Sequence, residues 1–306
     1  MSPVNAFVRG ERFRAGLLSA LLLLVFLGVW HLATTGGASP AAGASAPVQS
    51  LTPEQIEYLK LMGKDPGTAA GGGGTAPAVK SGFPTLAQMG EVIVKHASSP
   101  FYDNGPNDKG LGLQLAHSLG RVGLGYLLAA LVAIPLGFLI GMSPLVYRAL
   151  DPFIQVLKPI SPLAWMPLAL YTIKDSGISG VFVIFICSIW PMLINTAFGV
   201  ASVRREWLNV ARTLEVTPLR RAFQVILPAA APTILTGMRI SMGIAWLVIV
   251  AAEMLVGGTG IGYFVWNEWN NLSLPNVILA ILVIGLVGMA LDMMFGRLQK
   301  AVTYVD

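Results

Sequence analysis

The sequence predicts an all-α, polytopic membrane protein with about six transmembrane helices, and three observations support this fold class. Of the 306 residues, 55% are hydrophobic and only 11% are charged, and the mean hydropathy is +0.69. Soluble domains carry about 25% charged residues, so this chain has more apolar surface than a core of its own could bury. Several charge-free runs reach or exceed the length of about 20 residues that a helix needs to cross a bilayer. Arginine and lysine collect between these runs, which is typical of loops that stay in the cytoplasm.

The apolar runs place the spans one after another along the chain. The first run, residues 17–33, follows Arg9, Arg12 and Arg14. The third run is short and rich in proline, and the fifth is interrupted only by Glu253. We predict spans at residues 16–34, 112–140, 153–173, 178–201, 232–256 and 275–296.

The first span has an alternative interpretation as a cleavable signal peptide. A basic start, an apolar stretch and small residues around Ala44, Ser45 and Ala46 fit that pattern. The apolar run is longer than most signal-peptide cores, which favours a retained helix. Cleavage would leave five spans and would not move the basic loops to the other side of the membrane.

The distribution of arginine and lysine predicts the orientation of the spans. The amino terminus, the loops at 141–158 and 202–231, and the carboxyl-terminal tail are basic and fall on one side. The segment 35–111, which contains no arginine, falls on the other side with the short links at 174–177 and 257–274. Both termini are therefore predicted to be cytoplasmic.

Segment 35–111 is predicted to be an extracytoplasmic linker with short amphipathic helices. Residues 35–82 are rich in glycine, alanine, proline and serine and show little periodicity, as expected of a linker. Thr52 followed by Pro53 is a helix-start pattern. A second helix is predicted at 84–98, where residues recur at helical spacing: Leu86, Met89, Val92, Ile93 and His96.

The most basic stretch of the chain is residues 204–239, with six arginines against two glutamates. Residues 211–214 read ARTL and residues 226–228 read ILP, and this stretch resembles the EAA loop of ABC-importer permeases. The resemblance covers about 112–300, including SLGRV at 118–122 and LDPF at 150–153. It implies the type I ABC permease fold, with residues 112–300 as the permease domain. The segments before it are assigned by their own composition: residues 1–34 are a cytoplasmic terminus plus first helix, and residues 35–111 are the linker. The EAA-like loop spans 204–228.

Four segments are similar to the nitrate/bicarbonate branch of that family, and sulfonate and taurine permeases resemble them less closely. The segments are residues 161–167, 188–196, 245–254 and 260–266. The resemblance implies a permease subunit of an ATP-driven importer in a bacterial inner membrane, serving nitrate assimilation. Nitrate, with nitrite, is the first expected substrate; bicarbonate, cyanate and sulfonate or taurine are alternatives.

The same resemblance implies the partners. We expect a permease homodimer, two cytoplasmic ABC ATPase subunits that hold ATP and Mg²⁺, and a periplasmic or lipid-anchored substrate-binding protein. No cofactor is expected on this chain.

The EAA-like loop departs from the family pattern at several positions. The pattern reads Glu-Ala-Ala, three residues, then Gly, and here those positions hold Asn209, Val210, Ala211 and Glu215. A glycine there would ease a turn. Without the resemblance, the loop could be a solvated cytoplasmic segment. With it, the residues expected to contact the ATPase are Asn209, Val210, Ala211, Arg212, Thr213, Leu214 and Glu215.

Five residues within the apolar runs are candidates for an anion pathway. Charged side chains inside a membrane are costly and usually face a cavity or pair with each other, and a cation such as Arg121 is the expected host for an anion. The alternative is that Arg121 extends to the headgroups and that Glu253 pairs with a basic or backbone group. Core packing is the alternative for the tryptophans and the asparagine. The candidates are Arg121, Trp190, Asn195, Trp246 and Glu253.

Other classes of protein are disfavoured by residue content. A single Cys187 excludes an intramolecular disulfide, and His31, His96 and His117 are too scattered for a metal site. The glycines at 257–262 lack the Lys-Ser/Thr pair of a phosphate loop, so ATP must be hydrolysed on another chain. The sequence shows no cluster of catalytic residues, so we do not expect an enzyme.

The distribution of charges and the internal sequence pattern disfavour two further classes, nucleic-acid-binding proteins and secondary transporters. The basic residues flank apolar runs and do not form a nucleic-acid face. A secondary anion transporter would need coupling-ion residues in several spans or an inverted repeat. The sequence contains neither.

Overall fold

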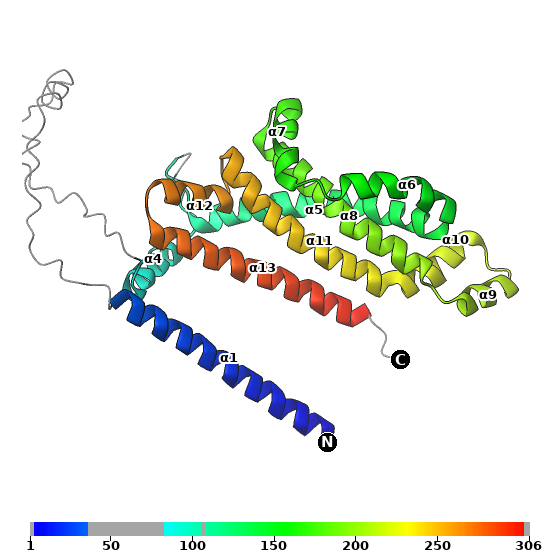
Figure 1. Ribbon diagram of the computed structural model, residues 1–306, viewed down its shortest axis with the longest axis horizontal. Helices are drawn as coiled ribbons and strands as arrows, with labels where there is room; N and C mark the ends of the chain where they lie inside the picture. Colours follow the sequence, from blue (N-terminus) through cyan, green and yellow to red (C-terminus); the bar gives the residue numbers. More distant parts are fainter. Residues whose placement is uncertain (1–2, 36–82, 106–107, 303–306) are drawn as a thin grey trace, which may run out of the picture. The chain divides into compact units, whose positions relative to one another are not determined.

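The computed structural model describes residues 3–35, 83–105 and 108–302, and within these ranges the regular secondary structure is helical (Figure 1). An isolated bridge joins Asp103 and Lys109. The chain divides into two units, Met1–Gly90 and Glu91–Asp306, which are described separately. Residues 36–82 of the predicted linker, which include the helix predicted to begin at Thr52, lie outside the described residues.

The first unit contains helix α1 (Pro3–Thr35), of which Phe13–Thr34 is long and apolar enough to cross a membrane. The predicted helix at 84–98 is confirmed as α4 (Leu86–Ser98), which begins in this unit. Its start is a reciprocal capping pair: the Thr85 N–H donates to Gln88 Oε1 (3.0 Å), and the Gln88 N–H donates to Thr85 Oγ1 (3.4 Å). This arrangement satisfies two backbone donors that a helix start leaves unpaired.

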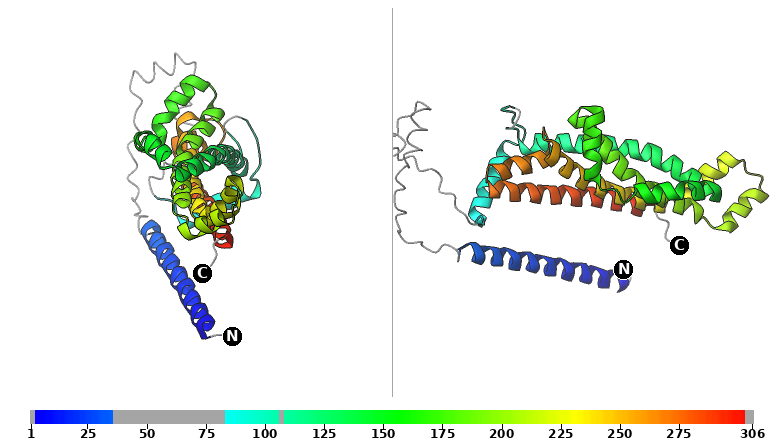
Figure 2. Two further views of the ribbon diagram at one scale, coloured as in Figure 1. Left: turned by 90° about the vertical axis from the view of Figure 1, so that its right-hand side faces the viewer. Right: turned by 45° about the horizontal axis from the view of Figure 1, so that its top comes forward.

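The second unit is a bundle of long helices (Figures 1 and 2). It is built from α5 (Leu111–Met142), α8 (Ser176–Ala201), α11 (Leu227–Val256) and α13 (Leu274–Val302). Helix α8 packs along both α5 and α11, and α13 packs on α11. These helices confirm the second, fourth, fifth and sixth predicted spans.

Glycines at the helix crossings explain how α8 approaches both neighbours so closely. A Cβ on Gly125 of α5 would lie 2.8 Å from Ile184, and one on Gly237 of α11 would lie 2.6 Å from the Asn195 Cβ. In a bilayer, helix association depends on close van der Waals packing, because lipid tails are as apolar as leucine. The outward side chains of α5 are correspondingly apolar: Leu127 is 60% exposed and Leu131 is 70% exposed.

The third predicted span, 153–173, is wrong as a continuous helix. Two helices, α6 (Pro144–Leu157) and α7 (Pro162–Ile173), meet at a bend of 91°. Pro159 and Pro162 lack the N–H that would continue the ladder. Pro162 also disfavours helical geometry in Ser161, whose ψ is 135°. Because α6 spans Pro144–Leu157, most of the segment predicted as a loop at 141–158 is helical. The described part of the chain has five helices able to span a membrane, or six if this bent pair counts as one.

The connections at the two ends of the bundle also differ from the predicted loops. Helix α9 (Arg205–Thr213) is followed by α10 (Pro218–Arg221) and a π-helical turn η1 (Ala222–Ile226) that runs directly into α11. The link predicted at 257–274 contains α12 (Ile261–Asn270). We call the end where α5 and α8 finish, and which carries α9 and α10, the basic end (Figure 1).

Candidate functional site

Helix α9 is held against the basic end of the bundle by its inward side chains. Leu208 packs against a small core that includes Val203 of the α8–α9 connection and Ile226 of η1. Ala211 is 4% exposed. The dipole of α9 is matched by Glu206 in its first turn and Arg212 in its last. Helix α9 is thus packed against the start of α11 and is not a solvated loop.

An adjacent side of α9, continued by its C-cap residue, presents a row of exposed apolar side chains. Trp207, Val210 and Leu214 are 48%, 58% and 70% exposed, and their spacing places them on one face. Leu219 and Phe223, 74% and 66% exposed, follow on α10 and η1. We call these five residues the α9–α10 face. Large exposed apolar side chains grouped on neighbouring elements among charged residues are typical of an interaction site.

Exposed arginines are interspersed in sequence with the residues of the α9–α10 face. The Arg204 guanidinium lies 5.6 Å from the centre of the Trp207 ring. Arg212 and Arg220, which are close in sequence to Leu214 and Leu219, are also exposed. An apolar patch rimmed by cations suits an acidic-rimmed groove on a partner protein.

The turn after α9 explains the most conspicuous departure from the EAA pattern. Glu215, at the position where the pattern has glycine, adopts a left-handed φ of 51°. Its N–H donates to the Arg212 carbonyl, and the Val216 N–H donates to the Ala211 carbonyl, both at 3.0 Å. These two bonds are the Schellman ending of a helix, which usually places glycine in the left-handed position. The geometry of the turn is kept although the glycine is not.

This turn predicts different outcomes for two substitutions of Glu215. Glu215→Gly removes about 1 kcal/mol of left-handed strain, and the greater freedom of glycine in the unfolded chain offsets roughly half of it. We expect unchanged uptake and a melting temperature equal to or slightly above that of the wild type. Glu215→Val, whose branched side chain tolerates a positive φ poorly, should melt earlier. Equal melting temperatures for both purified variants would contradict this account.

Six of the seven residues expected to contact an ATPase are exposed, and one is not. Ala211 is buried and anchors α9, whereas the others are free to contact a partner: Asn209, Val210, Arg212, Thr213, Leu214 and Glu215. The sequence prediction missed Leu219 and Phe223, because they read as the approach to the next span. Leu219 and Phe223 are four residues apart in a helix that starts at Pro218, so they lie on one face. This spacing is the sequence signal that could have identified them.

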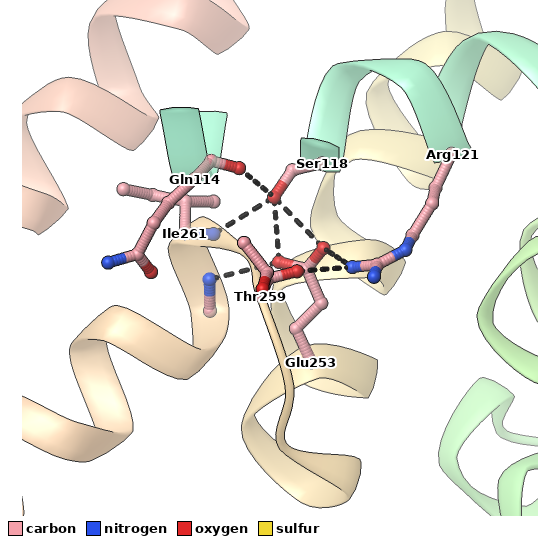
Figure 3. A network of polar contacts seen from close by, with 7 residues as sticks. Gln114, Ser118, Arg121, Glu253, Thr259 and Ile261 are labelled. Atoms are coloured by element: carbon pink, nitrogen blue, oxygen red, sulfur yellow. Dashed lines mark hydrogen bonds and ion pairs between the residues drawn. The ribbon is translucent and has the colours of Figure 1, made fainter. Parts of the chain in front are cut away.

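A buried polar network ties α5 to the other end of α11 (Figure 3). The Glu253 carboxylate, 4% exposed, accepts hydrogen bonds from Ser118 Oγ at 2.8 and 2.9 Å and from Arg121 Nη1 at 2.9 Å. The Gly262 N–H donates to it at 3.1 Å. Arg121 also donates to the Thr259 carbonyl at 2.6 Å. Arg121 and Glu253 are therefore partners of each other, which is one of the two arrangements expected for charges inside a membrane.

Glycines let the 257–262 turn wrap around this carboxylate. A Cβ on Gly260 would lie 2.2 Å from the carboxyl carbon of Glu253, and one on Gly262 would lie 2.1 Å from the Val250 carbonyl oxygen. Gly257 adopts a φ of 80°, which favours glycine. The Ile261 N–H donates to Ser118 Oγ at 2.9 Å. The glycine-rich segment thus encloses Glu253 and starts α12.

The space beside this network is too small for a polyatomic anion in this state. A cavity of about 10 Å³ is lined by residues that include Arg121, Gly180 and Glu253. That volume holds about one water molecule. The network therefore acts here as a clasp between helices, with its charges compensated by each other and by neighbouring donors.

The three other candidates for an anion pathway lie in helix contacts. Trp246 is 5% exposed and donates from Nε1 to the Ile284 carbonyl at 3.0 Å. Asn195 donates from Nδ2 to the Pro191 carbonyl at 2.8 Å, where Gly237 approaches. Trp190 is half-buried against the main core. Gly180 of α8 lines the small cavity beside Arg121. Asn195 lies 15 residues further along α8, or roughly 22 Å away, so the structure does not bring Asn195 together with Arg121.

Comparisons with known proteins agree with this architecture. Residues 133–304 match the family described as "Binding-protein-dependent transport system inner membrane component". A nitrate import permease protein NrtB of Synechocystis sp. is 46% identical over 222 residues, which are 72% of this chain and 81% of that protein. An NrtB of Leptolyngbya laminosa is 49% identical over 203 residues, 66% of this chain and 73% of that protein. The bicarbonate transport system permease protein CmpB of Synechocystis sp. is 46% identical over 204 residues, 66% and 73%.

A solved structure supports the same fold at much lower identity. The inward-facing MetNI methionine ABC transporter aligns with a TM-score of 0.56 at 14% identity, covering 62% of this chain and 94% of that chain. The match shows a shared helical arrangement. Together, the matched residues, the relatives and the membrane-spanning bundle show that this chain is a multi-pass membrane protein of the binding-protein-dependent transport system inner membrane component family, the ABC-importer permeases.

Proposed function

We propose that this chain is the permease subunit of an ATP-driven importer, and that the α9–α10 face docks on a separate ATPase subunit. The observation that carries the proposal is an exposed apolar face fixed by Leu208 and Ala211 to the start of α11. If the α9–α10 face is bound to a partner, a displacement of that partner can be transmitted to α11, the helix that follows.

Helix α11 is the element that connects the two ends of the bundle. The helical stretch Pro218–Val256 comprises 39 residues, or about 58 Å. It begins at the α9–α10 face and ends three residues after Glu253, whose clasp holds α5 and the start of α12. We propose that closure of the ATPase subunits shifts this stretch and exchanges outward-open for inward-open states of a permease homodimer.

The partners follow from this arrangement. Two cytoplasmic ATPase subunits would bind ATP and Mg²⁺, and a periplasmic or lipid-anchored binding protein would deliver the substrate on the other side. Both termini and the α9–α10 face would be cytoplasmic, in agreement with the arginines at 204–221. The chain itself would perform no catalysis.

Nitrate is the proposed substrate, and bicarbonate is the second candidate. The support for nitrate is 46% and 49% identity to two nitrate import permeases, and the support for bicarbonate is 46% identity to a bicarbonate permease. Both are small monovalent oxyanions, so one helical scaffold could serve either. Nitrite, cyanate and sulfonates share that charge.

We propose that Arg121 and Glu253 serve the anion pathway by positioning α5, α11 and α12. The helices that flank the anion pathway would be held at fixed distances by Trp190, Asn195 and Trp246. These roles are consistent with the contacts of each side chain.

Uptake by the reconstituted complex tests the proposal. The permease, ATPase and binding protein are placed in liposomes, and uptake of labelled nitrate and labelled bicarbonate is measured with and without ATP. We expect ATP-dependent nitrate accumulation and weaker bicarbonate uptake. Accumulation driven by an ion gradient without the ATPase would contradict the proposal and favour a secondary transporter. Preferential bicarbonate uptake would overturn the substrate alone.

A further inference from the structure

The contact between α11 and α13 carries an ion pair that the clasp does not involve. Arg239 of α11 donates from Nε to Asp292 Oδ1 at 2.6 Å and from Nη2 to Asp292 Oδ2 at 2.5 Å. This is the two-pronged geometry in which arginine binds carboxylates most strongly. One α-helical turn toward the basic end, Gln299 donates to Thr236 at 2.9 Å. Two polar contacts, one turn apart on α11, thus join two helices that are mostly apolar.

Contacts with α5 and α8 place the pair near the middle of the bundle. Next to Arg239, the Met238 carbonyl accepts a hydrogen bond from Tyr126 at 3.0 Å. Tyr126 is 15 residues from the start of α5 and 16 from its end, or roughly 23 Å from either. Ser241, half a turn beyond Arg239, donates to the Ser188 carbonyl in the middle of α8 at 2.7 Å.

The ion pair is open toward the outside of this chain. The side chains of Arg239 and Asp292 are 40% and 55% exposed. At mid-depth, exposed charges face a hydrated cavity or another protein surface, because contact with lipid is costly. Arg239 does not extend to a membrane surface, since Asp292 holds its guanidinium at this level.

The guanidinium keeps hydrogen-bonding capacity beyond this pair. Arginine has five N–H donors, and the contacts to Asp292 use Nε and Nη2 only. Among the described residues, Nη1 has no protein acceptor. Gly296 of α13 leaves room beside it, since a Cβ there would lie 3.6 Å from Arg239 Cζ.

We propose that Arg239 lines the hydrated translocation pathway and binds the transported oxyanion at mid-depth, with Asp292 limiting its affinity. This inference rests on the proposed function and adds a substrate-binding residue to it. Nitrate and bicarbonate are planar oxyanions that match a guanidinium edge as a carboxylate does. Asp292 keeps the site weak enough for the anion to leave, as conduction requires.

The pathway role and a purely structural role predict different results for an apolar replacement of both residues. In R239M/D292L the charges are replaced by side chains of similar volume, a change that is often neutral or stabilising for a structural pair. We expect the complex to assemble and melt normally while nitrate uptake falls at least about tenfold, because the charged hydrogen bonds to the anion are lost. Uptake within about twofold of the wild type would overturn the inference.

A single substitution tests the role of Asp292. D292N leaves Arg239 without its counter-charge. We expect the half-saturation concentration for nitrate and the maximal uptake rate both to fall, because the anion binds more tightly and leaves more slowly. A raised half-saturation concentration would contradict that role.

Cysteine labelling tests the hydration of the site independently of transport. In a background with the buried Cys187 replaced by serine, Asp292→Cys should react with a charged, membrane-impermeant thiol reagent, and nitrate should slow the reaction. Leu131→Cys, on the apolar outer side of α5, serves as the control and should not react. An unreactive Asp292→Cys would overturn the inference. If the wild-type complex itself fails to assemble or transport, the proposed function fails instead.

Discussion

We expect Leu214→Arg to abolish ATP-driven uptake while the chain still inserts into the membrane. Leu214 is 70% exposed and belongs to the α9–α10 face, so the bundle folds without it. In the docked complex the new charge would be buried against a partner without a counter-charge, at a cost of several kcal/mol. We expect ATPase co-purification and nitrate uptake to fall at least about a hundredfold.

Two comparison variants separate loss of contact from loss of folding. Val94→Arg changes a similarly exposed apolar residue, 67% exposed on α4, and should leave ATPase binding intact. Ala211→Asp places a charge in a buried position and should also abolish transport, with α9 detached as shown by faster proteolysis of residues 204–221. Normal ATPase co-purification by Leu214→Arg would remove the α9–α10 face from the coupling role.

Breaking the clasp at Glu253 is the second large expected effect. Glu253→Ala leaves Arg121, Ser118 and the Gly262 N–H without their shared acceptor. Removing one member of a buried ion pair costs about 3–5 kcal/mol. We expect a markedly lower melting temperature of the purified complex and loss of uptake.

A double-mutant cycle measures the coupling within the clasp. Arg121→Met alone should also destabilise, because Glu253, at 4% exposure, loses its cationic partner. The double variant Arg121→Met with Glu253→Leu should be more stable than either single variant, since no uncompensated charge remains. Additive losses in the unfolding experiment would show that the two residues do not act as a pair.

Hydropathy predicted most of the spans because each long helix is apolar on nearly all sides. It failed at 153–173, where the run is apolar enough but Pro159 and Pro162 divide it. It also missed α12, a ten-residue helix whose start depends on Gly262 and Ile261 bonding to residues of α11 and α5. Such non-local contacts leave no periodic pattern in the sequence.

The candidate site was only partly predictable for the same reason. Arg121 and Glu253 could be identified from the sequence as charged residues within apolar runs. Because 132 residues separate them, the sequence did not show that they bind each other. The sequence pattern grouped Arg239 with the basic stretch at 204–239, whereas the structure places it within α11, paired with Asp292. Which side of a helix faces a neighbour depends on packing, which hydropathy does not encode.

The most direct test of the central claim measures ATP hydrolysis and nitrate uptake together in the same proteoliposomes, for the wild type and Leu214→Arg. We predict that nitrate-loaded binding protein stimulates both activities in the wild type and neither in the variant. Nitrate uptake that continues in Leu214→Arg at the wild-type rate, with ATP hydrolysis still coupled to it, would contradict the claim that the α9–α10 face transmits the work of the ATPase.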